Sequence, residues 1–174
     1  MNTLFLKSCF ASRNLLLGAF LLIALTCSAA PPRTGDSFPA LKQFGLEGNV
    51  PDLQGKVALV DFWASWCAPC KRSFPVMKEL QDKFGARGFV VVAVCLDEKK
   101  PAMDEFLKKN PNAFVVLHDP KGHLAQAMSI ETMPTSFLVG KDGKILSVHK
   151  GFDVEPTRKA YLTEVEKALT TGNK

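Results

Sequence analysis

The stretch FWASWCAPCKRSFP, residues 62–75, places two cysteines two residues apart where an apolar run gives way to a helical pattern. Residues 57–64 (VALVDFWA) are almost all apolar and begin with β-branched side chains, as in a strand covered on both faces. From Cys67 onward, apolar residues recur every three or four positions, which predicts an amphipathic helix. The cysteine pair therefore lies where a buried strand ends and a helix begins.

This position gives the two cysteines different chemistry. The unpaired amides and the dipole of a helix N-terminus stabilise a thiolate, which is the nucleophile of disulfide exchange. Cys67 is therefore expected to attack, and Cys70, one turn further on, to resolve the mixed disulfide. A purely structural bridge would close a loop of only two residues and would constrain the unfolded chain very little. A zinc site needs four ligands, and the sequence offers no second cysteine pair or histidine pair at helical spacing, so a redox pair is favoured.

The first thirty residues have the order of a secretory signal. Lys7 and Arg13 are their only charges, residues 15–27 are apolar, and small residues follow. We expect cleavage after residue 29 or 30, which would leave one exported, periplasmic domain over residues 31–174. The apolar run is shorter than the roughly 20 residues that a bilayer span needs, but an uncleaved membrane anchor over residues 1–30 is the alternative.

Charge and cysteine count argue against a nucleic-acid-binding protein and against a disulfide-framework protein. The net charge of +5 would fall to about +3 without Lys7 and Arg13 of the signal, which is too mild to indicate nucleic-acid binding, and no basic run is interleaved with aromatic residues. Cys9 and Cys27 would leave with the signal, and the three cysteines that remain do not make a disulfide framework. Cys95 lies inside an apolar run and is expected to be a buried, inert thiol.

The remaining patterns predict an α/β fold with a mixed central sheet and helices on both faces. The Gly- and Pro-rich lead, residues 31–56, should form a short strand or hairpin that pads one edge. Pro75 should kink the first helix. Expected strands cover residues 57–64, 88–98, 114–119, 132–140 and 144–151, of which the last two form an antiparallel hairpin. Expected helices cover residues 67–84, 101–110, 121–130 and 155–169.

At this point the residues resemble a known family. VALVDFWASWCAPCKRSFP, residues 57–75, is similar to the active-site segment of the thioredoxin superfamily, including the proline five residues after the second cysteine. Met133-Pro134-Thr135 matches the loop that bears the cis-proline of that superfamily, and Gly151 follows the hairpin. The chain is most similar to the exported TlpA-like branch (ResA- and CcmG-like, redoxin/AhpC-TSA). That resemblance rests on the GDSFPAL lead, the W-C-x-P-C motif and a helix–strand insert at residues 97–130.

The resemblance implies a thioredoxin-like fold and a thiol-disulfide oxidoreductase that needs no cofactor beyond its redox-active disulfide. It further implies that the protein reduces disulfide-containing extracytoplasmic proteins and so contributes to cell redox homeostasis. A membrane protein that donates thiol electrons would be its second partner, and the protein would act as a monomer. Ser73 stands where members that reduce apocytochrome c often carry an acidic residue, which argues against a role in cytochrome c maturation.

The resemblance also assigns the remaining site residues. The peptide bond before Pro134 would be cis, and the backbone of Met133 would pair with an extended substrate strand. Trp66 and Gly151 would lie beside that strand, whereas Trp63 is expected to pack in the core. Asp61 matches the family position that moves a proton to or from the second cysteine, and burial within its apolar strand would raise its pKa.

Two other functions stay open. A peroxidase is one, although Leu59 and Trp63 stand where the Pro and the Thr or Ser of the peroxidatic signature would precede Cys67. A copper-binding chaperone is the other, because thiolates suit Cu(I) and a distant histidine, His149 or His123, could complete the site. Cysteine pairs of that kind are typically spaced by three residues rather than two.

Overall fold

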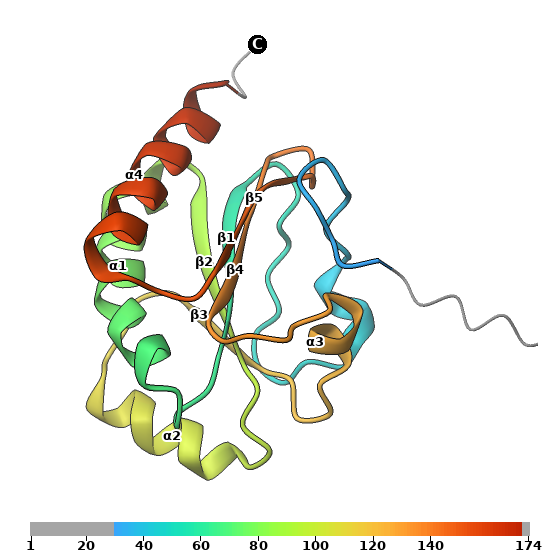
Figure 1. Cartoon of the computed structure of the whole chain (residues 1–174), viewed down its shortest axis with the longest axis vertical. Helices are drawn as coiled ribbons and strands as arrows, with labels where there is room; N and C mark the ends of the chain where they lie inside the picture. The colour runs from blue at the N-terminus through green and yellow to red at the C-terminus, as the bar shows by residue number, and fades with distance from the viewer. Residues whose placement is uncertain (1–29, 172–174) are drawn as a thin grey trace, which may run out of the picture.

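One mixed sheet of five strands, in the order β3-β2-β1-β4-β5, forms the centre of the protein (Figure 1). A computed structural model describes residues 30–171, so the predicted signal lies outside the described residues except for its last position. The strands are parallel from β1 to β3, and β4 and β5 form the expected antiparallel hairpin. Their bounds are β1 Val57–Trp63, β2 Phe89–Cys95, β3 Val115–His118, β4 Thr135–Val139 and β5 Ile145–Lys150.

Helices cover both faces of this sheet, as the sequence predicted (Figure 1). Helices α1 and α4 lie against one face, and α3 lies against the other together with the lead. Helix α1 continues without interruption through Pro75. Within the described part of the chain, no helix has both the length and the apolar character that membrane crossing requires. The helices are α1 Ala68–Phe84, α2 Lys100–Lys109, α3 His123–Ala127 and α4 Val154–Thr171, with short 3-10 segments η1 Leu41–Phe44 and η2 Gly85–Arg87.

The lead differs from the expected strand or hairpin at one edge. Single bridges join Ser37 to Lys144 beside β5 and Glu47 to His118 at the end of β3, so the lead reaches both edges of the sheet. Between these bridges the 3-10 turn η1 buries Leu41 against the second face. Its glycines and prolines interrupt any extended ladder, and its apolar side chains cover the sheet instead of extending it.

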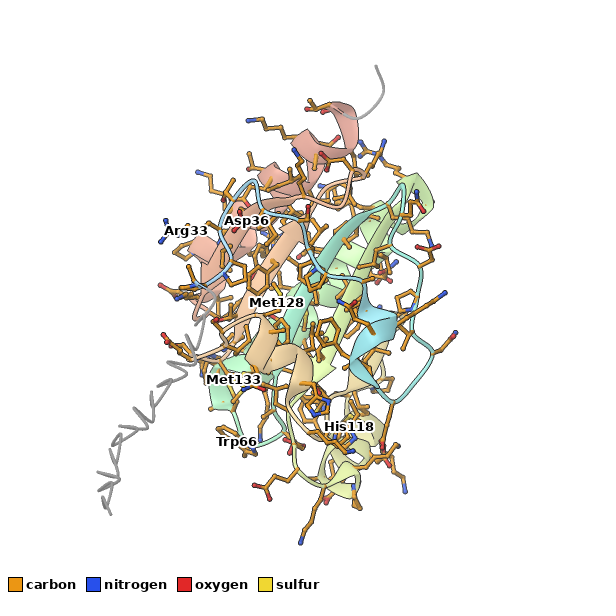
Figure 2. The ribbon with its side chains drawn as sticks, turned by 90° about the vertical axis from the view of Figure 1, so that its right-hand side faces the viewer. Arg33, Asp36, Trp66, His118, Met128 and Met133 are labelled. Carbon is orange, nitrogen blue, oxygen red and sulfur yellow. A yellow bond between two sulfur atoms is a disulfide. The ribbon has the colours of Figure 1, made fainter. Side chains whose placement is uncertain are left out.

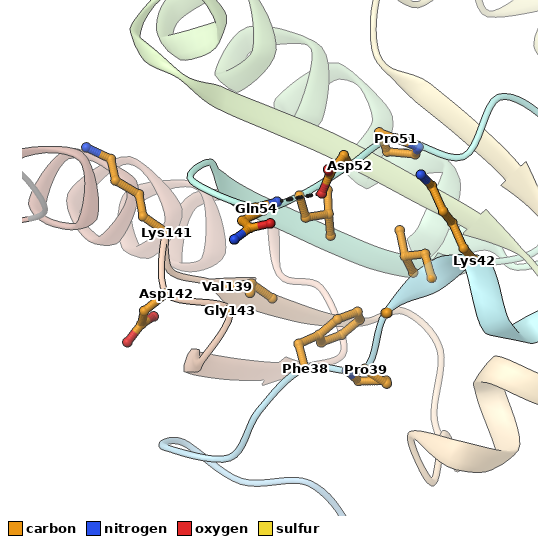
Figure 3. Close-up of a pocket in the computed structure, with 13 residues that line it drawn as sticks. Phe38, Pro39, Lys42, Pro51, Asp52, Gln54, Val139, Lys141, Asp142 and Gly143 are labelled. Atoms are coloured by element: carbon orange, nitrogen blue, oxygen red, sulfur yellow. Dashed lines mark hydrogen bonds between the residues drawn. The ribbon is translucent and has the colours of Figure 1, made fainter.

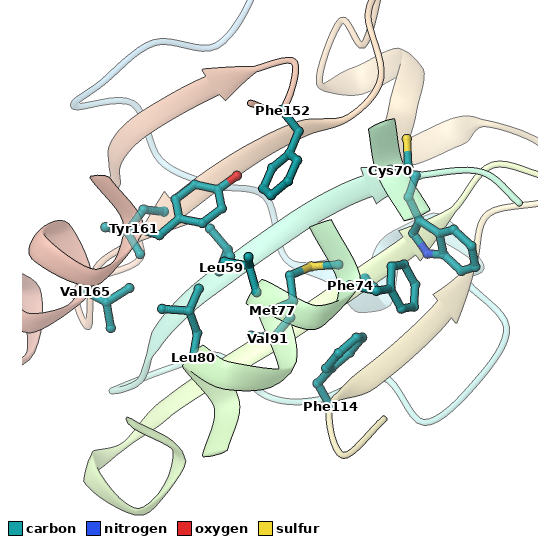
Figure 4. Close-up of a cluster of buried hydrophobic side chains, with 14 of the residues drawn as sticks. Leu59, Cys70, Phe74, Met77, Leu80, Val91, Phe114, Phe152, Tyr161 and Val165 are labelled. Atoms are coloured by element: carbon teal, nitrogen blue, oxygen red, sulfur yellow. The ribbon is translucent and has the colours of Figure 1, made fainter. Parts of the chain in front are cut away.

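The buried side chains form two clusters because alternate residues of β1 point to opposite faces of the sheet. All seven residues of β1 are buried, which explains why its sequence is apolar without alternation. The cluster under α1 and α4 holds both cysteines of the pair together with Leu59, Trp63, Phe74, Met77, Leu80 and Val165 (Figure 4). The opposite cluster holds Leu41, Ala58, Val60, Phe62, Leu124 and Phe137.

Candidate active site

Cys67 and Cys70 form a disulfide at the start of α1, with their Cα atoms 5.3 Å apart. Cys67 is the N-cap residue of the helix, and its Sγ accepts a hydrogen bond from the Cys70 amide at 3.3 Å. The two sulfur-bearing residues differ in access: Cys67 is 6% exposed and Cys70 is 0% exposed. Cys67 is therefore the more accessible of the two to a reagent that arrives from solvent.

The turn between β1 and α1 is held by a residue that the sequence pattern did not single out. Asp97, which is 3% exposed, follows β2 and accepts a 2.9 Å hydrogen bond from the Ser65 amide on its Oδ1. A second bond of 2.8 Å joins the Leu96 amide to the Trp63 carbonyl. Only the strand order could have indicated Asp97 from the sequence, because residues that follow neighbouring parallel strands meet at the same edge of a sheet.

The two tryptophans have opposite environments. Trp63 is 0% exposed and its ring lies 4.6 Å from that of Phe74, so it packs in the core as expected. Trp66 is 69% exposed and directly precedes Cys67. Figure 2 shows Trp66 at the same end of the molecule as Met133. Trp66 is therefore an apolar surface beside the more accessible cysteine.

The peptide bond between Met133 and Pro134 is cis, as the resemblance implied. Gly151 lies beside it, since the Gly151 amide donates a 2.7 Å hydrogen bond to the Pro134 carbonyl. Met133 is partly buried and packs against the same apolar cluster that contains Cys67 and Cys70. The fold thus brings the cis-proline loop, the residue after β5 and the cysteine pair to one end of the sheet.

Asp61 is buried in the middle of β1, with 1% of its surface exposed. Its side chain lies on the α1 and α4 face, because Leu59 and Trp63 at alternate positions belong to that cluster. Burial raises the pKa of Asp61 well above its usual value, as the sequence predicted. Among residues 30–171, no group forms a hydrogen bond with its Oδ2. The carboxyl is therefore poised to hold a proton on the same side of the sheet as Cys70.

Ser136 and Tyr161 are two further polar residues that the sequence pattern did not single out. Ser136 faces Asp61 across β1 and β4, and its Oγ lies 2.6 Å from the Tyr161 hydroxyl. Burial first, and then the nearby charge of Asp61, raise the pKa of Tyr161. A serine inside an apolar strand and the only tyrosine of the chain were the signals available in the sequence.

Among the described residues, the third cysteine and two of the histidines have other environments. Cys95 is buried, and burial raises its pKa to about 12, which makes it the inert thiol that was expected. His118 and His149 each pair with a glutamate, at 2.9 Å and 2.8 Å respectively. Across the described residues, no group of three or more His, Cys, Asp or Glu side chains is arranged to hold a metal ion.

A separate pocket lies at the end of the sheet far from the cysteines (Figure 3). Phe38 and Pro39 of the lead form one side, and Val139 and Gly143 at the β4–β5 turn form another. Its lining contains none of the site residues expected from the sequence. The chemistry of the cysteine pair is therefore located at the opposite end from this pocket.

Comparison with known proteins agrees with this geometry. A family model described as Redoxin matches residues 33–167. The chain belongs to the Redoxin family. Among curated relatives of this redoxin is the thiol-disulfide oxidoreductase ResA of Bacillus subtilis (strain 168). The two are 33% identical over 128 residues, which cover 74% of this redoxin and 72% of ResA.

Solved structures resemble this redoxin as well. A putative thiol:disulfide interchange protein DsbE from Chlorobium tepidum is 40% identical with a TM-score of 0.74, covering 79% of this redoxin and 99% of that protein. The pneumococcal exposed lipoprotein thioredoxin Etrx1 from Streptococcus pneumoniae strain TIGR4 is 29% identical with a TM-score of 0.57. The match covers 67% of this redoxin and 87% of that protein. The Cys67–Cys70 pair is thus the redox disulfide of a TlpA-like thiol-disulfide oxidoreductase with a thioredoxin-like fold.

Proposed function

We propose that this redoxin acts as a reductant of disulfides in other extracytoplasmic proteins. It would do so as a single exported domain over residues 31–174, after removal of the signal at residues 1–30. The signal-like order of the N-terminal residues supports export, and exposure of the similar pneumococcal lipoprotein agrees with it. The substrates would therefore be folded or folding proteins in an oxidising compartment.

The difference in access between the two cysteines is the observation that carries this proposal. Cys67 retains an exposed fraction and caps α1, whose N-terminal amides and dipole stabilise its thiolate. Cys70 has no exposed surface, so a substrate sulfur cannot reach it before bonding to Cys67. Cys67 is accordingly the attacking sulfur, and Cys70 is the resolving sulfur.

Reduction of a substrate disulfide takes two exchange steps. In the first, the Cys67 thiolate bonds to one sulfur of the substrate disulfide and displaces the other sulfur as a thiolate. In the second, Asp61 takes the proton of Cys70, whose sulfur then attacks Cys67 and expels the remaining substrate sulfur. The departing sulfur takes up the proton from Asp61. Two electrons have passed to the substrate, and the Cys67–Cys70 disulfide remains.

The surface around Cys67 suits an extended segment of a substrate protein. The cis-proline loop offers the backbone of Met133 for strand pairing, and Gly151 lies next to Pro134 without a side chain to obstruct an incoming strand. The exposed Trp66 ring provides an apolar contact beside the reacting sulfur. Substrate binding would thus combine backbone hydrogen bonds with one large apolar side chain.

Continued turnover requires a partner that restores the dithiol. Each cycle leaves the protein oxidised, and an extracytoplasmic compartment does not supply reduced thiols in excess. A membrane protein that passes thiol electrons outward is the class of donor that fits this need. The donor would attack Cys67 by the same exchange chemistry in reverse.

Trapping of mixed disulfides tests the proposed function. The Cys70→Ser variant should form a mixed disulfide with a substrate protein through Cys67 and should retain it, because no thiol is left to resolve it. The matched Cys67→Ser variant should trap none. Equal trapping by the two variants would contradict the assigned order of the cysteines.

The direction of electron flow is tested separately by the reduction potential of the Cys67–Cys70 couple. Equilibration in dithiol/disulfide buffers, followed by tryptophan fluorescence, gives this value. A potential near about −270 mV, close to that of thioredoxin, supports a reductant. A potential near about −120 mV would instead identify an oxidant and would overturn the proposed direction.

A further inference from the structure

A row of polar residues crosses the largely apolar α1 and α4 face of the sheet. Asp61 on β1 pairs in register with Ser136 on β4, and Ser136 pairs in turn with His149 on β5. On the other side of Asp61, the register partner on β2 is Ala93. Register partners point to the same face, so the row leads from the buried carboxyl towards the β5 edge. His149, at the outer end, has 21% of its side chain exposed.

Tyr161 of α4 covers this row. Its hydroxyl lies 2.6 Å from the Ser136 Oγ, and its ring stands nearly perpendicular to that of His149 with the centroids 5.0 Å apart. Figure 4 shows Tyr161 reaching inward from α4 with its hydroxyl pointing away from the helix. Tyr161 is 3% exposed, and the charge of Asp61 acts on it. The two hydroxyls therefore lie in a dry environment close to the carboxyl.

The buried Asp61 carboxyl is not fully hydrogen-bonded by the described residues. Its Oδ2 is buried, and no hydrogen-bond partner for that atom exists among the described residues. The groups that titrate on this face are Cys70 from α1, Cys95 from β2, Tyr161 from α4 and His149 from β5, with Glu164 hydrogen-bonded to His149. Burial is the cause that raises the pKa of Asp61, and within residues 30–171 no cation acts against it. A hydroxyl is thus the polar group that the register places beside the carboxyl.

We propose that Ser136 and Tyr161 are positioning residues of the redox reaction: their paired hydroxyls reorient to satisfy Asp61 in both its neutral and its ionised form. A hydroxyl has one hydrogen to donate and two lone pairs that accept. When Asp61 is ionised, Tyr161 donates to Ser136, and the Ser136 hydrogen is free to donate to the carboxylate. When Asp61 is protonated, Ser136 donates to Tyr161, and its oxygen is free to accept the Asp61 proton.

This switch explains how a buried carboxyl can give up its proton without a cationic neighbour. A carboxylate in an apolar site is costly unless a donor compensates it, whereas a neutral carboxyl in the same site requires an acceptor. Because Oδ2 of Asp61 has no hydrogen-bond partner among the described residues and the Ser136 hydroxyl contacts Tyr161, the Ser136 side chain must turn towards the carboxyl to reach it. The Ser136–Tyr161 pair then supplies whichever group is needed, without moving the backbone. The inference rests on the proton-carrying role proposed above for Asp61 and adds the residues that make this role feasible.

The test is a titration of the Asp61 carboxyl by NMR in protein labelled at aspartate, in the oxidised and the reduced state. Ser136→Ala should lower the acid dissociation constant of Asp61 by about tenfold, because the donor lost to the ionised form is worth more than the acceptor lost to the neutral form. Tyr161→Phe should lower it in the same direction by a smaller factor. Ser136→Thr, which keeps the hydroxyl, should restore the wild-type titration.

Ser147→Ala is the matched control, since Ser147 also lies on β5 beside α4 and hydrogen-bonds Glu164, but its register partner is Leu138. It should leave the Asp61 titration unchanged. The shift caused by Ser136→Ala should also persist when His149→Gln removes the imidazole at the outer end of the row. If the Ser136→Ala shift disappears in the His149→Gln variant, the shift does not arise from the Ser136–Tyr161 hydroxyl pair, and the inference is overturned.

Superimposable Asp61 titrations in wild type, Ser136→Ala and Tyr161→Phe would refute the inference. If Ser136→Ala does not fold, Tyr161→Phe alone decides, because it removes one oxygen and keeps the ring. The titration needs no turnover, so it is independent of mixed-disulfide trapping by Cys70→Ser. A failure of this inference is therefore distinguishable from a failure of the proposed function.

Discussion

The amide of Gly151 donates a 2.7 Å hydrogen bond to the carbonyl of Pro134, so the residue after β5 fixes the loop that leads into β4. Gly151 has a φ of 80°, a conformation that residues with a side chain rarely adopt. A Cβ atom added at Gly151 would meet nothing within 4 Å. The space beside the cis peptide is therefore open, and a methyl group at Gly151 would enter the space that we propose for a substrate strand.

Gly151→Ala should consequently affect both folding and substrate binding. We expect the free energy of unfolding to fall by about 1–2 kcal/mol, because alanine is strained at this φ. We also expect kcat/KM for a protein disulfide to fall, since the methyl group would occupy the proposed docking space. Urea unfolding and turnover with a disulfide-containing protein measure the two effects.

Gly143→Ala separates these effects. Gly143 has a φ of 76° and equally open space around a Cβ, but it lies in the turn at the other end of the β4–β5 hairpin. It should lose similar stability and keep wild-type kcat/KM. Equal losses of activity in the two variants would show that strain, and not docking, accounts for the effect at Gly151.

The two tryptophans should respond in opposite ways to truncation. Trp66→Ala should change the free energy of unfolding by less than about 0.5 kcal/mol, because the ring is largely exposed, and should raise KM for protein substrates. Trp63→Ala should cost about 3–5 kcal/mol, because it empties a buried site. Leu146→Ala, at an exposed apolar residue on β5, is the control for loss of apolar surface. Unchanged KM in Trp66→Ala would contradict the proposed contact between this residue and substrate proteins.

Local patterns predicted most of the fold. The continuous apolar run of β1 and the three-to-four-residue spacing of α1 are properties of neighbouring residues, so they can be recognised without the structure. The lead could not be predicted in the same way. Its place is decided by contacts with distant elements, such as the burial of Leu41 against the second face and the bridge from Glu47 to His118.

The same distinction applies to the candidate site. The cysteine pair and Asp61 lie in one continuous segment, and their residue types and spacing indicate their chemistry. Asp97 meets Ser65 across 32 positions, and Ser136 meets Tyr161 across 25, so only the assembled sheet and α4 bring them together. Sequence reasoning therefore singled out the cysteine pair and Asp61, but not the contacts that Asp97, Ser136 and Tyr161 make in the folded protein.

His118 and Glu47 should give the attachment of the lead a pH dependence. Burial alone would lower the pKa of His118, but the hydrogen bonds with the Glu47 carboxylate and the Asp97 carbonyl outweigh it and raise the pKa. A raised histidine pKa contributes stability that is fully present below the usual value of about 6.5 and is lost as pH rises through the folded value.

To test this dependence, the free energy of unfolding in urea is compared for Glu47→Gln and wild type between about pH 5.5 and 9, a range in which histidine titrates. The variant should be less stable than wild type by about 1 kcal/mol or less at the acidic end, because Glu47 is half exposed. The difference should shrink at the alkaline end. A difference that does not vary with pH would mean that the ion pair makes no contribution.

Asp61→Asn should stabilise the protein and impair its chemistry. Burial raises the pKa of Asp61, so wild-type stability is fully present below the usual value of about 3.9 and falls as pH rises towards the folded value. The asparagine cannot ionise and avoids this loss. Its stability advantage should therefore be small in acid and grow with pH by at most about 1.4 kcal/mol per pH unit, until the folded pKa is passed.

The same variant should slow the resolution of a mixed disulfide by about tenfold to a hundredfold near neutral pH, because no group remains to take the Cys70 proton. Stopped-flow measurement of substrate thiol release, compared with pH-dependent unfolding, follows the two effects in one protein. Greater stability together with slower resolution is the pattern expected of a buried group kept for chemistry. Stabilisation with an unchanged resolution rate would assign the proton transfer to another acceptor.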